Sequence, residues 1–403
     1  MKITDVRTAI VKVDDFFKWI FIKVYTDEDI TGVGEATGVM SFAREVKTAV
    51  GEFKPMLIGE NPLNTERLFQ KMLRQFPSLP DWSGAGMFRS GPSADAAAGI
   101  EIALWDIKGK YLNCPVYSLL GGKFRDKIRL YSDLHAEKEE MEGSYSKTQI
   151  NVQGYINRAK EAIEKGFNAI KFDIDEHVPQ SMMPSTYERD HWNGSLNNTE
   201  IEKKAGIFAA VREAIGYDID LAIDCHWYYN TNSAIRLIKE LEGLKLMWIE
   251  DPVPYSNTEA MKKITESVET PILTGECLRN RHEFKDLIVN QAADIISPDI
   301  PCNSLQEVKK IADIADMYFT PVAPHNVGSP VSTLAAAHVC SSIPNFMILE
   351  YHHLSLPWWE KLIKTDKPLI ENGYIKVLDK PGLGIELNEE ELVKHLDEDE
   401  TLP

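Results

Sequence analysis

Apolar and polar residues alternate along the first part of the chain with the period of two that is typical of β-strands. The alternation covers residues 3–13 and 19–26 and a shorter run that ends at Glu35, so we expect three strands there. The pattern then changes to the helical period over residues 43–57, 64–76 and 93–112. Strands followed by helices predict an α+β unit.

From residue 127 to about residue 350, short apolar runs alternate with amphipathic helices. The apolar runs end at His135, Asp173, His226, Glu250, Glu276, Asp299, His325 and Glu350. Glu250 and Glu276 are 26 residues apart (276 − 250), which is about the length of a strand, a helix and two turns. Nothing marks the reversal that an open sheet would need, so eight strands at this spacing predict a closed α/β barrel of the TIM type.

The change of pattern predicts three segments: an α+β unit at 1–125, a barrel at 126–355 and a C-terminal segment at 356–403. The last segment regains strand character near residues 370–378, and we expect it to return to the N-terminal unit. Three connections are long. We expect residues 77–92 to form an ordered loop, the acidic residues 136–149 to be mobile or to pack on a neighbouring subunit, and residues 174–198 to form a lid.

Composition narrows the class of protein. The chain has 403 residues, of which 43% are hydrophobic and 26% charged, as in a water-soluble globular protein. It lacks an apolar run of the roughly 20 residues that cross a bilayer, and its N-terminus does not resemble a signal peptide, so we expect a cytoplasmic location. The five cysteines form no CxxC pair and are expected to be reduced thiols.

The formal net charge of −18 argues against nucleic acid and anionic membranes as partners. The same charge would repel an acidic metabolite. An anionic substrate would therefore need local positive charge from a metal ion, a lysine or an arginine.

Three carboxylates end consecutive strands of the predicted barrel: Asp224, Glu250 and Glu276. Strand ends of such a barrel face the active site, and three converging carboxylates are suited to a hard divalent cation. Each of them alone would more often cap the next helix. Because the three are in register, we interpret them as the ligands of one Mg²⁺ per subunit.

Two histidines lie near these ligands. His226 follows Asp224 by two residues, so on an extended strand both side chains would point to the same side, and His226 could exchange a proton with a metal-bound substrate. Asp299 and His325 end neighbouring strands, and a carboxylate bonded to Nδ1 would fix the tautomer that a general base needs. The alternatives are a structural His226, a helix-capping Asp299 and a loop His325.

Two further side chains are expected at the mouth of the barrel. Lys171 ends the second strand and would be costly to bury without an anion, so it is a candidate for binding a substrate carboxylate, although a surface lysine is the alternative. Glu350 ends the eighth strand, where a hydrogen-bonded carboxyl group could contact a developing enolate.

These motifs together resemble the enolase superfamily, in the branch of sugar-acid dehydratases related to mandelate racemase. The resemblance spans nearly the whole chain and includes Gly32-Val33-Gly34-Glu35-Ala36, the run from Ala103 to Lys110, Leu119-Leu120-Gly121-Gly122 and Pro381-Gly382-Leu383-Gly384. It implies a modified (β/α)7β TIM barrel with an α+β capping domain, and an oligomer of identical subunits. The superfamily uses Mg²⁺ with a lysine or histidine base.

Departures from the family pattern point to the subgroup. Racemases and several dehydratases carry a basic lysine where this chain has Asp173, whereas the Asp224-x-His226 motif resembles galactonate, gluconate and mannonate dehydratases, in which this histidine is a general acid. Lys171-Phe172-Asp173 and Phe88-Arg89-Ser90 are most similar to gluconate dehydratases. Residues expected to contact substrate are Lys171, Asp173, Arg89, Trp19 and Glu350.

The resemblance therefore implies dehydration of an aldonic acid, such as D-gluconate or D-galactonate, to a 2-keto-3-deoxy acid. His325, oriented by Asp299, would remove the C2 proton, and His226 would protonate the departing C3 hydroxyl. Xylonate and rhamnonate fit the same chemistry, since specificity would come from loops 14–19, 38–42 and 174–198. A racemase or epimerase, a cycloisomerase of the muconate type and a non-catalytic binding protein remain as alternatives.

Overall fold

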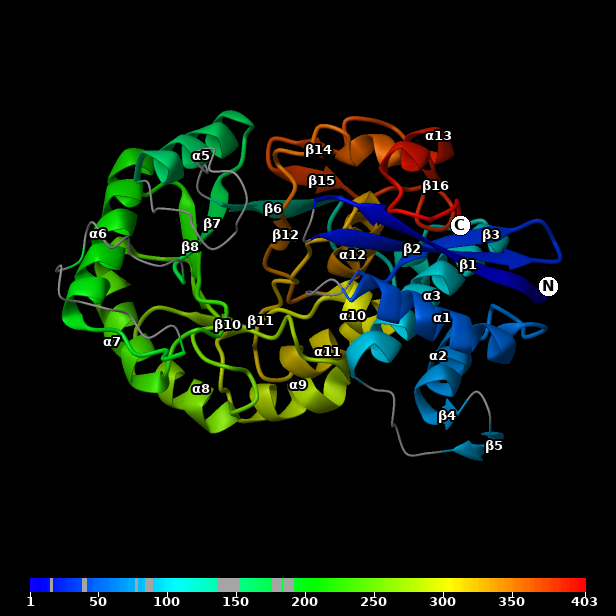
Figure 1. Ribbon diagram of the computed structural model, residues 1–403, viewed down its shortest axis with the longest axis horizontal. Coiled ribbons are helices and arrows are strands. Elements are labelled where there is room, and N and C mark those ends of the chain that lie inside the picture. The colour runs from blue at the N-terminus through cyan, green and yellow to red at the C-terminus, as the bar shows by residue number, and fades with distance from the viewer. Residues whose placement is uncertain are drawn as a thin grey trace.

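The computed structural model describes residues 1–14, 17–37, 42–76, 79–83, 90–135, 152–175, 183 and 192–403. Two parts lie side by side, with the N-terminal strands and helices at one end of the molecule and a ring of strands and helices at the other (Figure 1). We call the first part the capping domain and the second the barrel. Among the described residues, no helix has both the length and the apolar character needed to span a bilayer.

The capping domain consists of a small sheet covered by helices. Strands β1 (Ile3–Lys12), β2 (Lys18–Thr26) and β3 (Thr31–Glu35) form an antiparallel sheet in that order. Helices α1 (Ala43–Leu57), α2 (Thr65–Arg74) and α3 (Gly91–Tyr111) pack around one apolar core with these strands. A Cβ atom at Gly32 would lie 2.0 Å from the Ala103 carbonyl oxygen, so only glycine lets β3 approach α3 this closely.

A short strand pair follows α2, where the sequence predicts the end of a helix over 64–76 and then a loop over 77–92. β4 (Gln75–Phe76) is antiparallel to β5 (Leu79–Ser83), and α2 ends at Arg74. The ordered loop expected over 77–92 therefore contains a strand at residues 79–83, and α3 already begins at Gly91. The Pro and Ser residues of this segment are typical of loops. The hairpin is also short, because β5 pairs with a strand of only two residues.

The barrel strands are parallel and closed into a ring. The order is β6 (Lys127–Leu134), β7 (Ala169–Asp173), β8 (Asp220–Asp224), β9 (Ile249–Glu250), β10 (Ile272–Thr274) and β11 (Ile295–Ile296). The seventh strand is reduced to bridges from Val322 to Ile296 and to Phe346. β12 (Leu349–Tyr351) then pairs with β6 and completes the ring.

A layer of buried side chains inside the ring contains one residue from each of the eight strand positions. These residues are Tyr131, Ala169, Ala222, Trp248, Leu273, Ile295, Ala323 and Ile348. Large and small side chains share the layer, as expected when a barrel interior is filled by interdigitation. The predicted eight-stranded barrel is confirmed, including the seventh position, where regular pairing is almost absent.

Helices surround the ring, which the green and yellow ribbons of Figure 1 show. They are α5 (Val152–Glu164), α6 (Asn198–Ile215), α7 (Thr231–Leu241), α8 (Thr258–Thr265), α9 (Asn280–Val289), α10 (Ile300–Asn303), α11 (Leu305–Asp316) and α12 (Pro330–Ser342). A 3-10 turn, η3 (Glu242–Leu244), follows α7. β12 is followed by no α-helix before η4 (Trp359–Leu362), so the described barrel has the (β/α)7β form.

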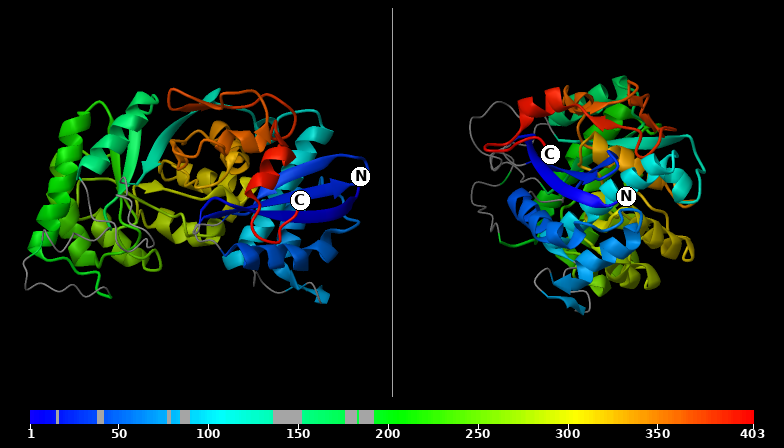
Figure 2. Two further views of the ribbon diagram at one scale, coloured as in Figure 1. Left: turned by 45° about the horizontal axis from the view of Figure 1, so that its top comes forward. Right: turned by 90° about the vertical axis from the view of Figure 1, so that its right-hand side faces the viewer.

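The C-terminal segment runs back along the capping domain, where its red ribbon lies beside the blue strands (Figure 2). Leu396 forms an antiparallel bridge with Val11, and Lys18 forms an ion pair with Asp397 at 2.6 Å. The segment includes β13 (Ile363–Lys364), β14 (Ile370–Glu371), β15 (Tyr374–Lys376), β16 (Glu386–Leu387), α13 (Glu389–Leu392) and η5 (Val393–His395). The domain limits at 125 and 355 stay predictions.

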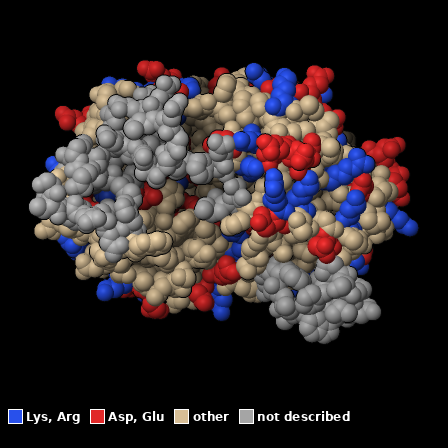
Figure 3. Space-filling model, in the orientation of Figure 1, with Lys and Arg blue, Asp and Glu red and all other residues tan. Residues whose placement is uncertain are grey.

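Charged side chains of both signs are interspersed over the capping domain on the face that Figure 3 shows. Lys23 pairs with Glu389 at 3.0 Å and Lys47 pairs with Glu400, so several of these charges join the sheet side to the C-terminal segment. On this face the described part of the capping domain is therefore not uniformly acidic.

Candidate functional site

The three predicted metal ligands converge at one end of the ring. Asp224 and Glu250 are register partners at the ends of β8 and β9, and Glu276 follows β10 by two residues. All three side chains are buried, and one oxygen from each lies within 4.8 Å of the others. Parallel pairing explains this convergence, because the carboxyl ends of neighbouring strands meet at the same rim.

The electrostatics of this triad fit a bound cation. Burial raises the pKa of Glu250 well above its ordinary value, and the Asp224, Glu350 and Glu276 carboxylates add to this effect while Lys171 opposes it. Burial and the Asp224 carboxylate also raise the pKa of Glu276. Oε1 of Glu250 is buried without a hydrogen bond in the described structure. An all-oxygen set of carboxylates with an excess of negative charge suits Mg²⁺ or Ca²⁺.

Lys171 lies among these carboxylates. Its Nζ is 3.0 Å from Asp224 Oδ2, 3.1 Å from Glu250 Oε2 and 2.8 Å from Glu350 Oε1. Burial lowers the pKa of Lys171, but the Glu250 and Glu350 carboxylates outweigh burial and raise it well above its ordinary value. The side chain is therefore a buried cation at the centre of the site and not a surface lysine.

The Asp299–His325 pair has the geometry of an oriented imidazole. Nδ1 of His325 lies 2.7 Å from Asp299 Oδ2, and its Nε2 lies 3.6 Å from Glu276 Oε2 and 3.7 Å from Glu350 Oε2. Asp299 also caps α10, because its Oδ1 accepts the Cys302 N–H at 2.8 Å. The pairing and the helix cap, considered as alternatives from the sequence, are both present.

The same carboxylates govern the charge of His325. Burial lowers its pKa, but Glu276 and Glu350 outweigh burial and raise the pKa well above its ordinary value. A cation among these carboxylates would oppose that effect, since it would compensate their charge.

His226 lies at the rim of the site in an unexpected backbone conformation. β8 ends at Asp224, and His226 has a φ of 43°, so the expected extended geometry is wrong. The chain turns because the His226 N–H donates to Asp224 Oδ1 at 2.9 Å. Nε2 of His226 nevertheless lies 3.8 Å from Asp224 Oδ2, and its Nδ1 lies 3.2 Å from Asp175 Oδ1.

His226 is held as a cation by its surroundings. Burial lowers its pKa, but the Asp224 and Asp173 carboxylates raise it well above its ordinary value. Its side chain is 37% exposed, in contrast to the buried His325. Its imidazole can therefore carry a proton at the open side of the triad.

Asp133 and His352 did not emerge from the sequence as site residues, and His135 emerged only as a strand end. His135 lies 2.9 Å from Asp173 Oδ2, and His352 lies 2.6 Å from Asp133 Oδ2, in each case through Nδ1. Asp133 lies on β6 two residues before the predicted strand end, and His352 lies two residues after Glu350. Both residues lie two positions from a predicted strand end, so the period of two of a β-strand is the sequence signal that points to them.

Of the expected substrate contacts, Trp19 does not face the site, and Arg89 lies outside the described residues. Trp19 is completely buried, and its indole N–H donates to the Val327 carbonyl at 3.2 Å. It is therefore a core residue between the capping sheet and the barrel, and we withdraw its assignment to substrate. Arg89, loop 38–41 and most of the predicted lid lie outside the described residues; of the lid aromatics, Trp192 is described and is 98% exposed.

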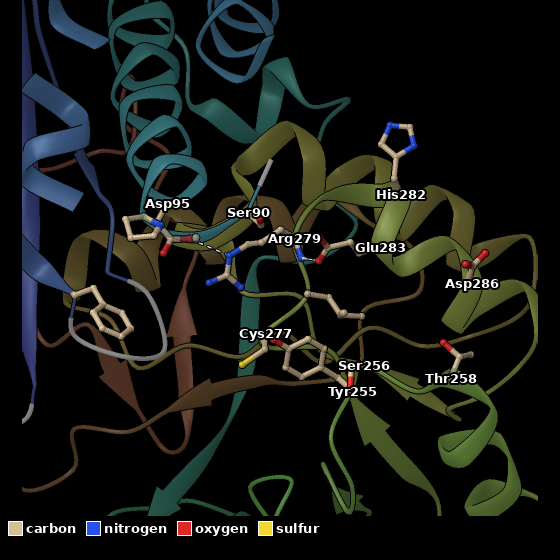
Figure 4. A pocket seen from close by; sticks show the side chains of 14 residues that line it. Ser90, Asp95, Tyr255, Ser256, Thr258, Cys277, Arg279, His282, Glu283 and Asp286 are labelled. Atoms are coloured by element: carbon tan, nitrogen blue, oxygen red, sulfur yellow. Dashed lines mark hydrogen bonds and ion pairs between the residues drawn. The ribbon is translucent and has the colours of Figure 1, made fainter. Parts of the chain in front are cut away.

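A pocket of about 600 Å³ opens between the capping domain and the loops that follow β9 and β10. Its lining includes Phe42, Asp95, Tyr255, Cys277 and Arg279. Figure 4 shows the guanidinium group of Arg279 directed toward Asp95, and the two form an ion pair at 2.9 Å. Because Cys277 follows the predicted ligand Glu276, this pocket borders the triad on the β10 side.

Comparison with protein families identifies the chain. Residues 3–121 match the N-terminal domain of the mandelate racemase and muconate lactonizing enzymes, and residues 154–391 match the enolase C-terminal domain-like family. The chain belongs to the mandelate racemase and muconate lactonizing enzyme family. Its predicted membership of the enolase superfamily, with a capping domain and a modified barrel, is confirmed.

Relatives within this family include two sugar-acid dehydratases. The D-xylonate dehydratase of Haloferax volcanii is 43% identical over 404 residues, which cover 100% of this chain and 90% of that protein. The D-galactonate dehydratase of Pectobacterium atrosepticum is 31% identical over 385 residues, which cover 94% of this chain and 91% of that protein. A dehydratase removes water, so the predicted class of hydro-lyase agrees with these relatives.

A solved structure supports the fold over the whole length. The mandelate racemase/muconate lactonizing enzyme-like protein of Rubrobacter xylanophilus matches this chain with a TM-score of 0.89 and 36% sequence identity. The match covers 99% of this chain and 98% of that one.

Proposed function

We propose that the protein dehydrates an aldonic acid to a 2-keto-3-deoxy acid with one Mg²⁺ per subunit. The arrangement of two imidazoles around one carboxylate triad carries this proposal. Nε2 of His325 lies within 3.6 Å of Glu276, and Nε2 of His226 lies within 3.8 Å of Asp224. β-elimination of water requires a base and an acid at separate places, and each imidazole lies beside a different carboxylate of the triad.

Asp224, Glu250 and Glu276 would hold the metal ion, and their buried, partly unpartnered oxygens support this assignment. A bound Mg²⁺ polarises the substrate carboxylate and so acidifies the neighbouring C2 proton. Lys171 supplies a second positive charge at the same place, which answers the repulsion expected between an acidic protein and an anionic substrate.

The chain's own residues then move the protons. His325, held by Asp299, removes the C2 proton, and the electron pair of the C2–H bond forms a C1=C2 bond. The positive charge of Lys171 compensates the negative charge that develops on the carboxylate oxygens. Glu350, 2.8 Å from Nζ, keeps that lysine in position and faces the same region.

His226 completes the elimination. It donates a proton to the C3 hydroxyl, the C3–O bond breaks, and water leaves while a C2=C3 enol forms. The enol becomes the 2-keto-3-deoxy acid by taking a proton at C3. Asp173 in place of a second-strand lysine supports elimination over racemisation, because the lysine would be the second base of a racemase.

The identity to a D-xylonate dehydratase makes D-xylonate the first substrate to test. The protein would be incubated with D-xylonate, D-gluconate, D-galactonate and L-rhamnonate in the presence of Mg²⁺ or excess EDTA. We expect a 2-keto-3-deoxy acid from at least one aldonate, and no product with EDTA. C2 epimers without keto acid would favour the epimerase, whereas an unchanged set of aldonates with Mg²⁺ would contradict an enzymatic function of this class.

A further inference from the structure

The rim of the barrel carries a second group of polar side chains that the proposed proton transfers do not use. It consists of Asp133, His135, Asp173 and His352, from the ends of the neighbouring strands β6, β7 and β12 (Figure 1). We call these four residues the polar wall. Within it, His135 pairs with Asp173, His352 pairs with Asp133, and the two imidazole rings meet edge to face with centroids 5.0 Å apart.

The polar wall continues directly from the proposed reaction site. Asp133 Oδ1 lies 3.9 Å from Nζ of Lys171, and Asp173 Oδ1 lies 3.9 Å from Nε2 of His226. From the capping domain, the ring of Phe17 comes within 5.2 Å of the His352 ring. A molecule held by Lys171 and His226 would therefore meet the polar wall next.

Three atoms of the polar wall are buried without a hydrogen bond in the described structure. They are Oδ1 of Asp133, Oδ1 of Asp173 and Nε2 of His135. Buried polar atoms nearly always have a partner in folded proteins, because leaving one unpaired is unfavourable. Three such atoms in one region beside the proposed reaction site are free to take their partners from a bound ligand.

The types of these atoms define the ligand. The two carboxylate oxygens accept hydrogen bonds. Burial lowers the pKa of His135, but the Asp173 carboxylate outweighs burial and raises it to about 9, so at neutral pH Nε2 carries a proton and donates. Hydroxyl groups both donate and accept, whereas a carboxylate or phosphate would be repelled by Asp133 and Asp173. The polar wall therefore fits a run of hydroxyl groups.

We propose that Asp133, His135, Asp173 and His352 bind the hydroxyl groups of the aldonate from C4 onward and so determine which chain lengths the enzyme accepts. This inference rests on the proposed function, and it adds three residues to the expected contact at Asp173. A site built to hydrogen-bond a hydroxyl group rejects an analogue that lacks it, because its own buried polar atoms are then left unpaired.

Two substitutions of His135 separate its two nitrogen atoms. The amide nitrogen of asparagine occupies the place of Nδ1, so His135→Asn keeps the bond to Asp173 and removes the group at Nε2. The longer side chain of glutamine brings its amide close to the place of Nε2. His135→Asn should therefore lose the ligand contact, and His135→Gln should retain part of it.

The binding of two acids to a His325→Asn protein loaded with Mg²⁺ would be measured by titration calorimetry. D-xylonate has hydroxyl groups beyond C3, whereas D-glycerate ends at C3. We expect His135→Asn to raise the Kd of D-xylonate at least about tenfold and that of D-glycerate less than about twofold, with His135→Gln between parent and Asn. His352→Asn should show the same preference for weakening D-xylonate.

His395→Asn is the matched control, because this imidazole stacks on Trp358 in the C-terminal segment; both Kd values should stay unchanged. If His135→Asn raised the Kd of both acids equally, or of neither, the proposed hydroxyl-binding role of the polar wall would be overturned, and the proposed function would stand. A parent that binds neither acid would overturn the proposed function and the wall with it. Asp133, His135 and His352 could also hold a metal ion, so a second bound metal equivalent that His352→Asn abolishes would overturn the hydroxyl site.

Discussion

At the scale of single residues, Asp299 and Asp224 each accept a backbone N–H and at the same time contact a side chain with a proposed role in the reaction. Asp299 caps α10 with one oxygen and orients His325 with the other. Asp224 accepts the His226 N–H and also faces Lys171 at 3.0 Å. Because backbone donors hold these carboxylates, their positions do not depend on a bound ligand, as pre-organised catalysis requires.

The metal assignment predicts the effect of neutralising one ligand. Glu276→Gln removes a negative charge from the triad, and we expect the Kd of Mg²⁺ to rise at least about tenfold, since the number of charged ligands sets affinity for such cations. Titration calorimetry with Mg²⁺ alone measures this without any substrate. The control is Glu266→Gln, because Glu266 is exposed. An unchanged affinity in Glu276→Gln would remove this residue from the ligand set.

At the scale of elements, acids of the capping domain cap helices of the barrel. Glu35 accepts the Ser329 and Ser332 N–H groups at the start of α12, each at 3.0 Å. Glu101 on α3 accepts the N–H groups of Leu305 and Gln306 at the start of α11, at 3.0 and 3.3 Å. Carboxyl oxygens that accept the otherwise unpaired N–H groups of a helix N-terminus are favourable, so these two contacts hold the capping domain over the strand ends.

The close approach of β3 to α3 gives a stability prediction. Gly32→Ala would place a Cβ 2.0 Å from a backbone oxygen that cannot move aside, and we expect it to cost at least about 1–3 kcal/mol of unfolding free energy. Gly51→Ala on α1 is the control: a Cβ there has no neighbour within 4 Å, and alanine should stabilise the helix by about 0.5–1 kcal/mol. Chemical denaturation measures both, and equal stability of the two variants would contradict the packing described.

Glu101 also predicts a pH dependence. Burial raises its pKa from 4.5 to about 7, and the hydrogen bonds from Trp105, Leu305 and Gln306 only partly oppose this. The folded pKa is the higher one, so this group's contribution to stability is complete below pH 4.5 and is lost as the pH rises through 7. As the pH rises from 4.5 to about 7, the wild type should lose up to about 3 kcal/mol of unfolding free energy relative to Glu101→Gln. If the unfolding free energies of the wild type and of Glu101→Gln changed with pH in parallel, the raised pKa of Glu101 would be contradicted.

At the scale of the whole molecule, the periodic spacing of strand ends was sufficient to predict the barrel, the triad and the Asp299–His325 pair. Parallel strands in sequence order bring their ends to one rim, so position in the sequence translates into position in space. This holds even for the seventh strand, where Val322 makes only isolated bridges.

Contacts between distant segments did not follow from the pattern. Trp19 has the alternation of a strand residue, but whether it faces substrate or the core depends on how the capping sheet meets Val327 and Trp358. The turn at His226 arises from a hydrogen bond to Asp224 and leaves no periodic trace. The pairing of His352 with Asp133 joins the last barrel strand to the first, 219 residues away.

The most direct test of the account is exchange of the C2 proton of D-xylonate in deuterated water with Mg²⁺, followed by NMR. His325→Asn should leave the C2 proton in place and form no product, because the base is missing. His226→Asn should incorporate deuterium at C2 while forming little or no 2-keto-3-deoxy acid, because the acid is missing. Normal exchange in both variants would contradict the assignment of His325 as the base and His226 as the acid.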